Sequence, residues 1–201
     1  TDLASGAKRL FERGKIEDDE PLKNEIEARF FSGQSCQVDG VFWAVYLPAP
    51  RLVIIGAVHI SQHMVAPAQA MGFDVRVIDP RTAFASRARF HHCALHAQWP
   101  EDILKEHPLD AYSALAALTH DPKIDDLPLV AALQARCFYV GALGSRKTHA
   151  KRVERLKAAG LSDEQIAFIK APIGLDVGAA SPAEIAIAVL AQIVAHLRGR
   201  L

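Results

Sequence analysis

Several common classes of protein require features that this sequence lacks. Its 23 lysine and arginine residues equal its 23 aspartate and glutamate residues, so the formal net charge is zero. Because nucleic acids and anionic membranes attract basic surfaces, we expect neither as a partner. No uninterrupted apolar run approaches the length of a membrane-spanning helix, and we expect no signal peptide. The first residue is Thr1 rather than methionine, which leaves room for residues upstream.

Cysteine is also scarce. Cys36, Cys93 and Cys137 show neither the paired spacing of a zinc motif nor the density of a disulfide framework. A reducing compartment fits this pattern best, and we expect a cytoplasmic protein. Cys36 and Cys137 lie in apolar, strand-like segments, where we expect them to be chemically inert.

Length and composition favour one domain with a sizeable core and a small N-terminal appendage. Half of the 201 residues are hydrophobic, which is enough to build such a core. Near the start, Leu3, Ala7, Leu10 and Phe11 have helical spacing, which predicts a first helix that ends near Gly14. The acidic run that follows is expected to be a solvated linker.

Residues 34–47 are expected to form a β-hairpin. Asp39-Gly40 lies between two alternating segments, and Asp-Gly in this position is typical of a type I′ turn. Prolines at positions 48 and 50 end the pattern, because proline cannot extend a central strand. We therefore place a boundary there, with one segment at residues 1–48 and a domain at residues 51–201.

Beyond this boundary, short apolar runs alternate with helical patterns. Strands are expected at residues 51–55, 74–78, 112–118 and 137–140, with a shorter one within 91–96. Helices are expected at residues 60–71, 100–106, about 125–134, 146–159 and 182–197, with a short one after Ser162. Such alternation predicts an α/β fold: a doubly wound, Rossmann-like, mainly parallel sheet with a small N-terminal helix and β-hairpin appendage.

The first strand, turn, helix and strand of this domain form a βαβ unit of the dinucleotide-binding kind. The three glycine positions of the usual fingerprint are occupied by Gly56, Val58 and Ser61. Gly56 suits the tight turn, but the branched side chain of Val58 obstructs the approach of a pyrophosphate. We therefore expect poor affinity for an NAD-type dinucleotide, improved by glycine at position 58. Asp79 ends the second strand, where an acid accepts hydrogen bonds from ribose hydroxyls.

A second candidate site follows the strand near residue 140. Gly141 and Gly144 free the backbone, Ser145 can cap the next helix, and Arg146 lies where the helix dipole is positive. This order predicts a cradle for phosphate. The alternative is a basic helix with a solvated face, since lysine and arginine continue to residue 157.

Titratable residues gather after the strand that ends near residue 118. His120 is expected to contact a ligand, and a His–Asp pair there could do acid–base work. We expect Asp125 or Asp126 to serve instead as the cap of the next helix. Asp176, between two glycines, is expected to face the same cleft or to hold a turn.

His59 and His63 lie four residues apart, a spacing that metal ligands can have on one helical face. No glutamate-bearing zinc-protease motif accompanies them, and we predict no metal site. No nucleophile–base pair is evident either, so no residue is assigned a catalytic role.

Five segments carry a resemblance to the XdhC/CoxI family, the xanthine dehydrogenase accessory proteins. They are LVIIGAVH at residues 52–59, LTHDPKIDD at 118–126, YVGALGSRKTH at 139–149, APIGLDVG at 171–178 and SPAEIA at 181–186. The resemblance covers about residues 50–199. It implies a chaperone rather than an enzyme, one that binds molybdenum cofactor, holds it for sulfuration by a cysteine desulfurase and passes it to a xanthine dehydrogenase-type molybdenum hydroxylase. It leaves room for a homodimer.

The resemblance implies that the loops at the strand ends bind this cofactor. The cofactor-binding residues are then Gly56, Val58, His59, Asp79, His120, Gly141, Gly144, Ser145, Arg146 and Asp176. The chain departs from the family in two places. Val58 stands where the family usually has glycine, and residues 1–48 are all that represents the family's amino-terminal domain.

Two functions of other classes remain open. The βαβ unit and Asp79 are compatible with an NAD-dependent oxidoreductase, against which Val58 argues. A metal-dependent hydrolase would use His59, His63 and His120 with nearby aspartates.

Overall fold

The computed structural model describes residues 1–200, apart from the side chain of Phe31. The chain forms two compact units, Thr1–Pro48 and Ala49–Leu201. No helix among residues 1–200 is long and apolar enough to cross a membrane.

The N-terminal unit contains one helix and one hairpin. Helix α1 is Lys23–Ser32, and strands β1 (Cys36–Val38) and β2 (Val41–Trp43) pair in antiparallel register. Asp39 and Gly40 join them, with φ values of 47° and 77°. Positive φ at both central residues is the signature of a type I′ turn, so the predicted hairpin is confirmed.

The predicted first helix is wrong. Residues 3–14 contain no helix, because Asp2 Oδ1 accepts hydrogen bonds from the backbone N–H of Ala4 and Ser5 and fixes a turn. Gly6 follows with a φ of 71°, which a right-handed helix cannot accommodate. Leu10, counted among the buried positions of that helix, is 96% exposed. The real helix, α1, has only a short apolar stripe around Ile26.

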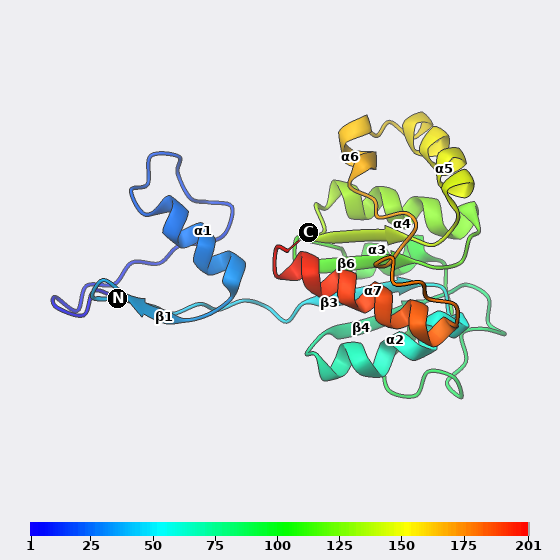
Figure 1. Cartoon of the computed structure of the whole chain (residues 1–201), viewed down its shortest axis with the longest axis horizontal. Coiled ribbons are helices and arrows are strands. Elements are labelled where there is room, and N and C mark those ends of the chain that lie inside the picture. The colour runs from blue at the N-terminus through cyan, green and yellow to red at the C-terminus, as the bar shows by residue number, and fades with distance from the viewer. Residues whose placement is uncertain (201) are drawn as a thin grey trace. The chain divides into compact units, whose positions relative to one another are not determined.

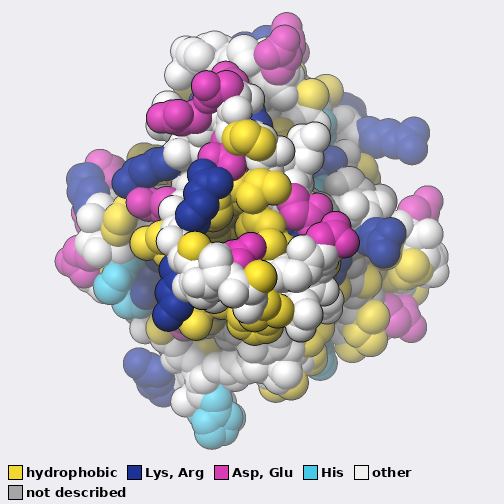
Figure 2. Space-filling view, turned by 90° about the vertical axis from the view of Figure 1, so that its left-hand side faces the viewer, with side chains coloured by type: hydrophobic (Ala, Val, Ile, Leu, Met, Phe, Trp, Pro, Cys, Tyr) yellow, Lys and Arg dark blue, Asp and Glu magenta, His cyan; other side chains and the backbone are white. Residues whose placement is uncertain are grey.

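Apolar side chains of the N-terminal unit surround a hollow of about 640 Å³. Figure 2 shows hydrophobic side chains on this unit between groups of acidic and basic ones. Its apolar lining includes Leu10, Phe11, Ile26, Phe30, Trp43 and Tyr46.

The second unit is built on a five-stranded sheet in the order β5-β4-β3-β6-β7. Every pairing in it is parallel. The strands are β3 (Arg51–Ile55), β4 (Asp74–Ile78), β5 (Ala94–His96), β6 (Ser113–Ala117) and β7 (Tyr139–Ala142). Numbered along this unit, the spatial order is 3-2-1-4-5, the order of a doubly wound dinucleotide-binding sheet. The predicted fold class is therefore confirmed.

Helices cover both faces of the sheet (Figure 1). Helices α2 (His59–Ala70) and α7 (Pro182–Leu197) lie on one face. The other face carries α3 (Pro100–Glu106), α4 (Pro122–Gln134), α5 (Arg146–Ala158) and α6 (Asp163–Ala167). Strand β3 shows why two cores form: Leu52 and Ile54 point into the first, while Val53 and Ile55 point into the second.

The order of the strands reverses between β3 and β6, because the chain leaves β3 toward β4 and later returns to its other side. Ligands of open α/β sheets bind at the carboxyl ends of the strands near such a switch point. Three loops meet that description: β3–α2, β6–α4 and β7–α5.

Candidate functional site

The β3–α2 loop is closed by contacts within the protein. Gly56 has a φ of 112°, and a Cβ there would lie 2.8 Å from Thr119 Cγ2 of the β6–α4 loop. Ser61 is fully buried and its hydroxyl donates to the carbonyl oxygens of Gly56 and Val58, at 2.7 and 2.8 Å. The glycine therefore permits both the turn and a close approach of the two loops.

The carboxylate of Asp79 is not available to accept hydrogen bonds from a ribose. It is fully buried, and its carboxylate accepts hydrogen bonds from Ala57 N at 2.8 Å and from Arg81 N, Nε and Nη2 at 3.0, 2.9 and 2.7 Å. Burial by itself raises the pKa of Asp79, but the bonds from Arg81 and Ala57 outweigh it and hold that pKa below its usual value. The ribose-binding assignment is corrected: the carboxylate ties the end of β4 to the β3–α2 loop.

Arg89 completes this arrangement from the segment after β4. Its Nη1 donates to Ala57 O at 2.9 Å, and its Nη2 donates to Gln62 Oε1 at 2.9 Å. The N–H and C=O of Ala57, beside the place of a pyrophosphate, are thus bonded to Asp79 and Arg89. Val58 itself is partly buried and packs against the core that α2 and α7 cover.

This arrangement replaces the expectation from the sequence that glycine at position 58 improves affinity: we now expect that Val58→Gly does not restore dinucleotide binding. Removing the side chain leaves the amide of Ala57 bonded to Asp79, so the loop still lacks a free donor at that position for a pyrophosphate. Titration with NADH, followed by cofactor fluorescence, should show the same weak affinity in parent and variant. A gain of about tenfold or more, equivalent to about 1.4 kcal/mol, would mean that Val58 alone blocks the loop.

His59 and His63 lie on α2 and both are exposed. Across residues 1–200, no three His, Cys, Asp or Glu side chains come together in a way that could hold a metal ion. Within that range, the structure therefore contains no set of side chains with which a metal-dependent hydrolase could bind its metal ion.

The β6–α4 loop differs from its prediction at the helix cap. Asp121, rather than Asp125 or Asp126, caps α4: its side chain accepts from Lys123 N at 3.0 Å, and Pro122 occupies the first helical position. The earlier cap is favoured because proline, which lacks an N–H, begins helices well. Just before it, His120 is exposed and has a φ of 63°, a left-handed conformation uncommon outside glycine.

Asp125 does not cap α4 and is buried instead. Its side chain is 1% exposed, and Oδ1 accepts from Thr119 Oγ1 at 2.7 Å. Oδ2 has no hydrogen-bond partner among the described residues. Burial raises the pKa of Asp125 to about 6, although Thr119 and the positive charge of Arg152 act against the increase.

In the β7–α5 loop, one of the two expected cradle glycines has another role. Gly141 lies inside β7, where a Cβ would come within 2.7 Å of the Ile173 side chain, so it serves packing. Gly144 does lie in the loop, with a φ of 135°, and a Cβ there would meet Thr148 and His120. Ser145 caps α5, as predicted, by accepting from Thr148 N at 3.2 Å.

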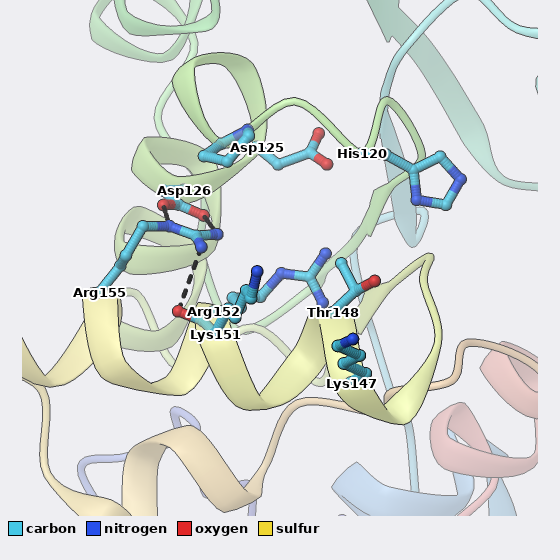
Figure 3. A pocket seen from close by; sticks show the side chains of 9 residues that line it. His120, Asp125, Asp126, Lys147, Thr148, Lys151, Arg152 and Arg155 are labelled. Carbon is cyan, nitrogen blue, oxygen red and sulfur yellow. Dashed lines mark hydrogen bonds and ion pairs between the residues drawn. The ribbon is translucent and has the colours of Figure 1, made fainter.

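A pocket of about 380 Å³ opens between these last two loops and the first turns of α4 and α5. Figure 3 shows the side chains of α4 on one side and those of α5 on the other, with His120 at one end. It is lined by His120, Pro122, Asp125, Asp126, Lys147, Thr148, Lys151, Arg152 and Arg155.

The charges that line the pocket leave a positive excess. Asp126 is already neutralised, because Arg155 Nε and Nη2 bind its two oxygens at 2.5 and 3.0 Å. Lys147, Lys151 and Arg152 then face the single carboxyl group of Asp125. Such a site attracts anions, and the positive end of the α5 dipole adds to the attraction.

Arg152 is the most unusual of these cations. It is 2% exposed, and Nη2 donates to Leu143 O at 2.9 Å, while Nε and Nη1 have no partner among the described residues. Burial lowers its pKa, and the carboxylates of Asp125 and Asp126 act against that decrease. Although His120 is exposed overall, partial desolvation of its ring, followed by the positive charge of Arg152, lowers the pKa of His120 as well.

Of the residues that line this pocket, the sequence predicts a ligand-binding role for His120 alone. Arg146 is exposed and lies outside the lining, whereas Lys147 and Lys151 belong to it. A signal is present in the sequence, since positions 147, 148, 151, 152 and 155 share one face of a helix. The same pattern is typical of a solvated face, because it does not say what packs against it.

Asp176 also lies apart from this pocket. It is exposed, in the segment between α6 and α7. That segment is held on α7: Gly174 N donates to Gln192 Oε1 at 2.9 Å, and Gln192 Nε2 donates back to Gly174 O. Of His120, Gly144 and Asp176, which were expected to converge, the structure brings together only the first two.

The family model of the XdhC Rossmann domain matches residues 52–193. The chain is similar to the molybdenum cofactor insertion chaperone PaoD of Escherichia coli K12, with 32% identity over 74% of this chain and 40% of PaoD. It is similar to a probable xanthine dehydrogenase subunit of Bacillus subtilis 168, with 30% identity over 73% of this chain and 43% of that protein.

Two further similarities extend over more of the chain. An uncharacterised E. coli K12 protein, YqeB, is 28% identical over 92% of this chain and 36% of its own length. The crystal structure of a protein described as a xanthine dehydrogenase from Bacillus halodurans superposes with a TM-score of 0.67. That match is 28% identical and covers 80% of this chain and 46% of the other. The chain thus spans about two fifths of the length of the curated relatives that it matches.

Proposed function

The chain belongs to the family of the XdhC Rossmann domain, and on that premise we propose that it binds molybdenum cofactor and delivers it to a xanthine dehydrogenase-type molybdenum hydroxylase. The names of two relatives support this proposal: one is a cofactor insertion chaperone and the other a probable xanthine dehydrogenase subunit. Because each relative is more than twice as long as the matched region, the delivery step is proposed for the whole protein.

The observation that carries the proposal is the pocket between α4 and α5. It has room of about 380 Å³, an excess of positive charge, and two buried charged side chains with unpartnered atoms. Buried polar groups are nearly always hydrogen-bonded, so unpartnered ones that line a pocket suggest a ligand. Molybdenum cofactor joins a pterin to a phosphate, and this lining offers partners to both.

The side chains that line the pocket support a carrier. No cysteine or serine is among them, and within residues 1–200 the histidine of the lining makes no hydrogen bond to a hydroxyl or thiol nucleophile. A carrier has to bind and release its cargo without transforming it. Sulfuration of the cargo by a cysteine desulfurase, and a homodimeric state, remain predictions from the resemblance.

Reconstitution tests the proposed delivery. Purified protein loaded with molybdenum cofactor is added to the apo-hydroxylase, and substrate oxidation is measured against free cofactor at the same concentration. We expect faster and more complete activation with the loaded protein. A hydroxylase that reaches full activity in a strain deleted for this chain's gene would contradict the proposal.

A pair of variants tests where the phosphate binds. Lys151→Gln removes a charge from the pocket lining, and we expect it to weaken binding of inorganic phosphate and of the cofactor about tenfold. Arg146→Gln removes a charge in the same region of α5 but outside the lining, and should change affinity less than about twofold. Isothermal titration of both variants measures the difference. If Arg146→Gln instead weakens binding more than Lys151→Gln does, the phosphate binds at the loop around Ser145.

A further inference from the structure

Two buried side chains of opposite charge line the pocket between α4 and α5 without satisfying one another. Asp125 is 1% exposed and Arg152 is 2% exposed. Asp125 uses Oδ1 to accept from Thr119, and Arg152 uses Nη2 to donate to Leu143 O. Asp125 Oδ2 and Arg152 Nη1 and Nε have no partner among the described residues. A buried charge left unpaired in this way is costly, and direct pairing would have reduced the cost.

The missing partner must carry two kinds of group. It needs a hydrogen-bond donor for Asp125 Oδ2 and an acceptor for Arg152 Nη1. Figure 3 shows the carboxyl group of Asp125 on the α4 side of the pocket and the guanidinium of Arg152 reaching up from α5 on the other side. A flat ring with a ring N–H beside a carbonyl presents both groups on one edge.

We propose that Asp125 and Arg152 together recognise the 2-amino-4-oxopyrimidine edge of a heterocycle, the edge that pterins share with guanine. The ring N–H donates to Asp125 Oδ2, and the neighbouring carbonyl oxygen accepts from Arg152 Nη1. A phosphate elsewhere on the same ligand meets Lys147 and Lys151, which line the same pocket. This inference rests on the proposed function and adds to it the residues that read the pterin.

Heterocycles without this edge should be rejected. Adenine has an amino group that can donate to Asp125, but it has neither the ring N–H nor a carbonyl, so its binding leaves Arg152 Nη1 without an oxygen acceptor. A site built to hydrogen-bond a polar group discriminates strongly against an analogue that lacks the group, because its own buried partner remains unsatisfied. Phosphate alone can reach the lysines but has no N–H for Asp125.

The test compares four probes at pH 7: 6-hydroxymethylpterin, GMP, AMP and inorganic phosphate. Pterin binding is followed by its fluorescence and the others by calorimetry. We expect the full chain to bind pterin and GMP at least about tenfold more tightly than it binds AMP. Tighter binding of pterin than of GMP identifies pterin as the source of the edge, and the reverse order identifies guanine.

Substitutions distinguish hydrogen bonding to the edge of the ring from the general attraction of an anion to the positive charges. Asp125→Asn directs an N–H toward the ligand's N–H, so pterin affinity should fall at least about tenfold while phosphate affinity is kept. Arg152→Met should weaken both, because it removes the donor and a positive charge. Asp74→Asn is the control, since Asp74 is exposed at the start of β4 and lies outside the pocket lining, and it should leave pterin affinity within about twofold.

The outcomes distinguish this inference from the proposed function. Equal affinity for GMP and AMP, or unchanged pterin binding by Asp125→Asn, overturns the edge recognition. If molybdenum cofactor still binds the parent and loses affinity in Lys151→Gln, the proposed function stands without it. If the parent binds neither pterin nor molybdenum cofactor, both fail.

Discussion

Replacing Asp79 with alanine is expected to lower the free energy of unfolding by about 3 kcal/mol. The carboxylate is fully buried and accepts from Ala57 N and from three nitrogens of Arg81. Its removal leaves the Ala57 amide without its acceptor and Arg81 without its counter-charge. The β3–α2 loop and the end of β4 would both loosen at the switch point of the sheet.

Denaturant unfolding at neutral pH measures this loss. Asp74→Ala is the matched control, because Asp74 begins the same strand but is exposed, and it should change stability by less than about 0.5 kcal/mol. The pKa of Asp79 lies below its usual value of 3.8, so its stabilisation is present above pH 4 and lost as the pH falls below that. The difference between parent and variant should therefore narrow in acid. Equal losses for Asp79→Ala and Asp74→Ala would contradict this account.

Asp125→Asn is expected to have the opposite effect and to stabilise the protein by about 3 kcal/mol above pH 6. The pKa of Asp125 is raised to about 6 from 3.8 by burial, and this difference corresponds to about 3 kcal/mol of destabilisation for the ionised form. The raised value already includes the attraction of Arg152. Asparagine keeps an oxygen for Thr119 and carries no charge to bury.

The pH dependence of stability shows independently that ionised Asp125 destabilises the folded state. Below about pH 4 the carboxyl is protonated in both the folded and the unfolded state, and it adds no pH-dependent term. Between about pH 4 and 6 the folded state keeps a proton that the unfolded state has lost, so the contribution of Asp125 becomes less favourable as the pH rises. Above pH 6 the full penalty is present. The stability difference between Asp125→Asn and the parent should therefore grow from pH 4 to 6 and then level off.

Thermal and denaturant unfolding across this range test the prediction. Asp126→Asn is the control for stability, since it breaks a partly exposed ion pair with Arg155 and should destabilise by about 1 kcal/mol or less. A parent that is as stable as Asp125→Asn at pH 8 would show that the carboxylate is better solvated than its burial implies. A gain in stability together with a loss of ligand affinity is the behaviour expected of a residue retained for binding.

The fold is largely predictable because its signals are local. Strands β3 and β4 fall at their predicted bounds, and Ser145, Ser162 and Ser181 cap the helices that follow them. The helix that was wrongly predicted at residues 3–14 is absent for a local reason as well. There a side chain, Asp2, competes with the helix for backbone N–H groups, and apolar spacing does not report that competition.

The candidate site is predictable only in part. Which loops gather at the switch point follows from strand order, and His120 and Gly144 do lie in those loops. The roles of individual charges do not follow. The sequence predicts an Asp79 free for a ligand, but Arg81 occupies its carboxylate, whereas Asp125, a predicted cap, is buried with a free oxygen.

For the second unit, the sequence by itself determined the layers, the order of helices and strands, and the family, because these depend on periodicity and on short motifs within single segments. Tertiary structure decided which charged side chains are paired, which are buried and which face the pocket. Asp125 belongs to α4 and Arg152 to α5, and only the packing of these two helices on one face of the sheet brings them to the same space. Burial and pairing are set by such distant neighbours, and the pattern along one helix cannot report them.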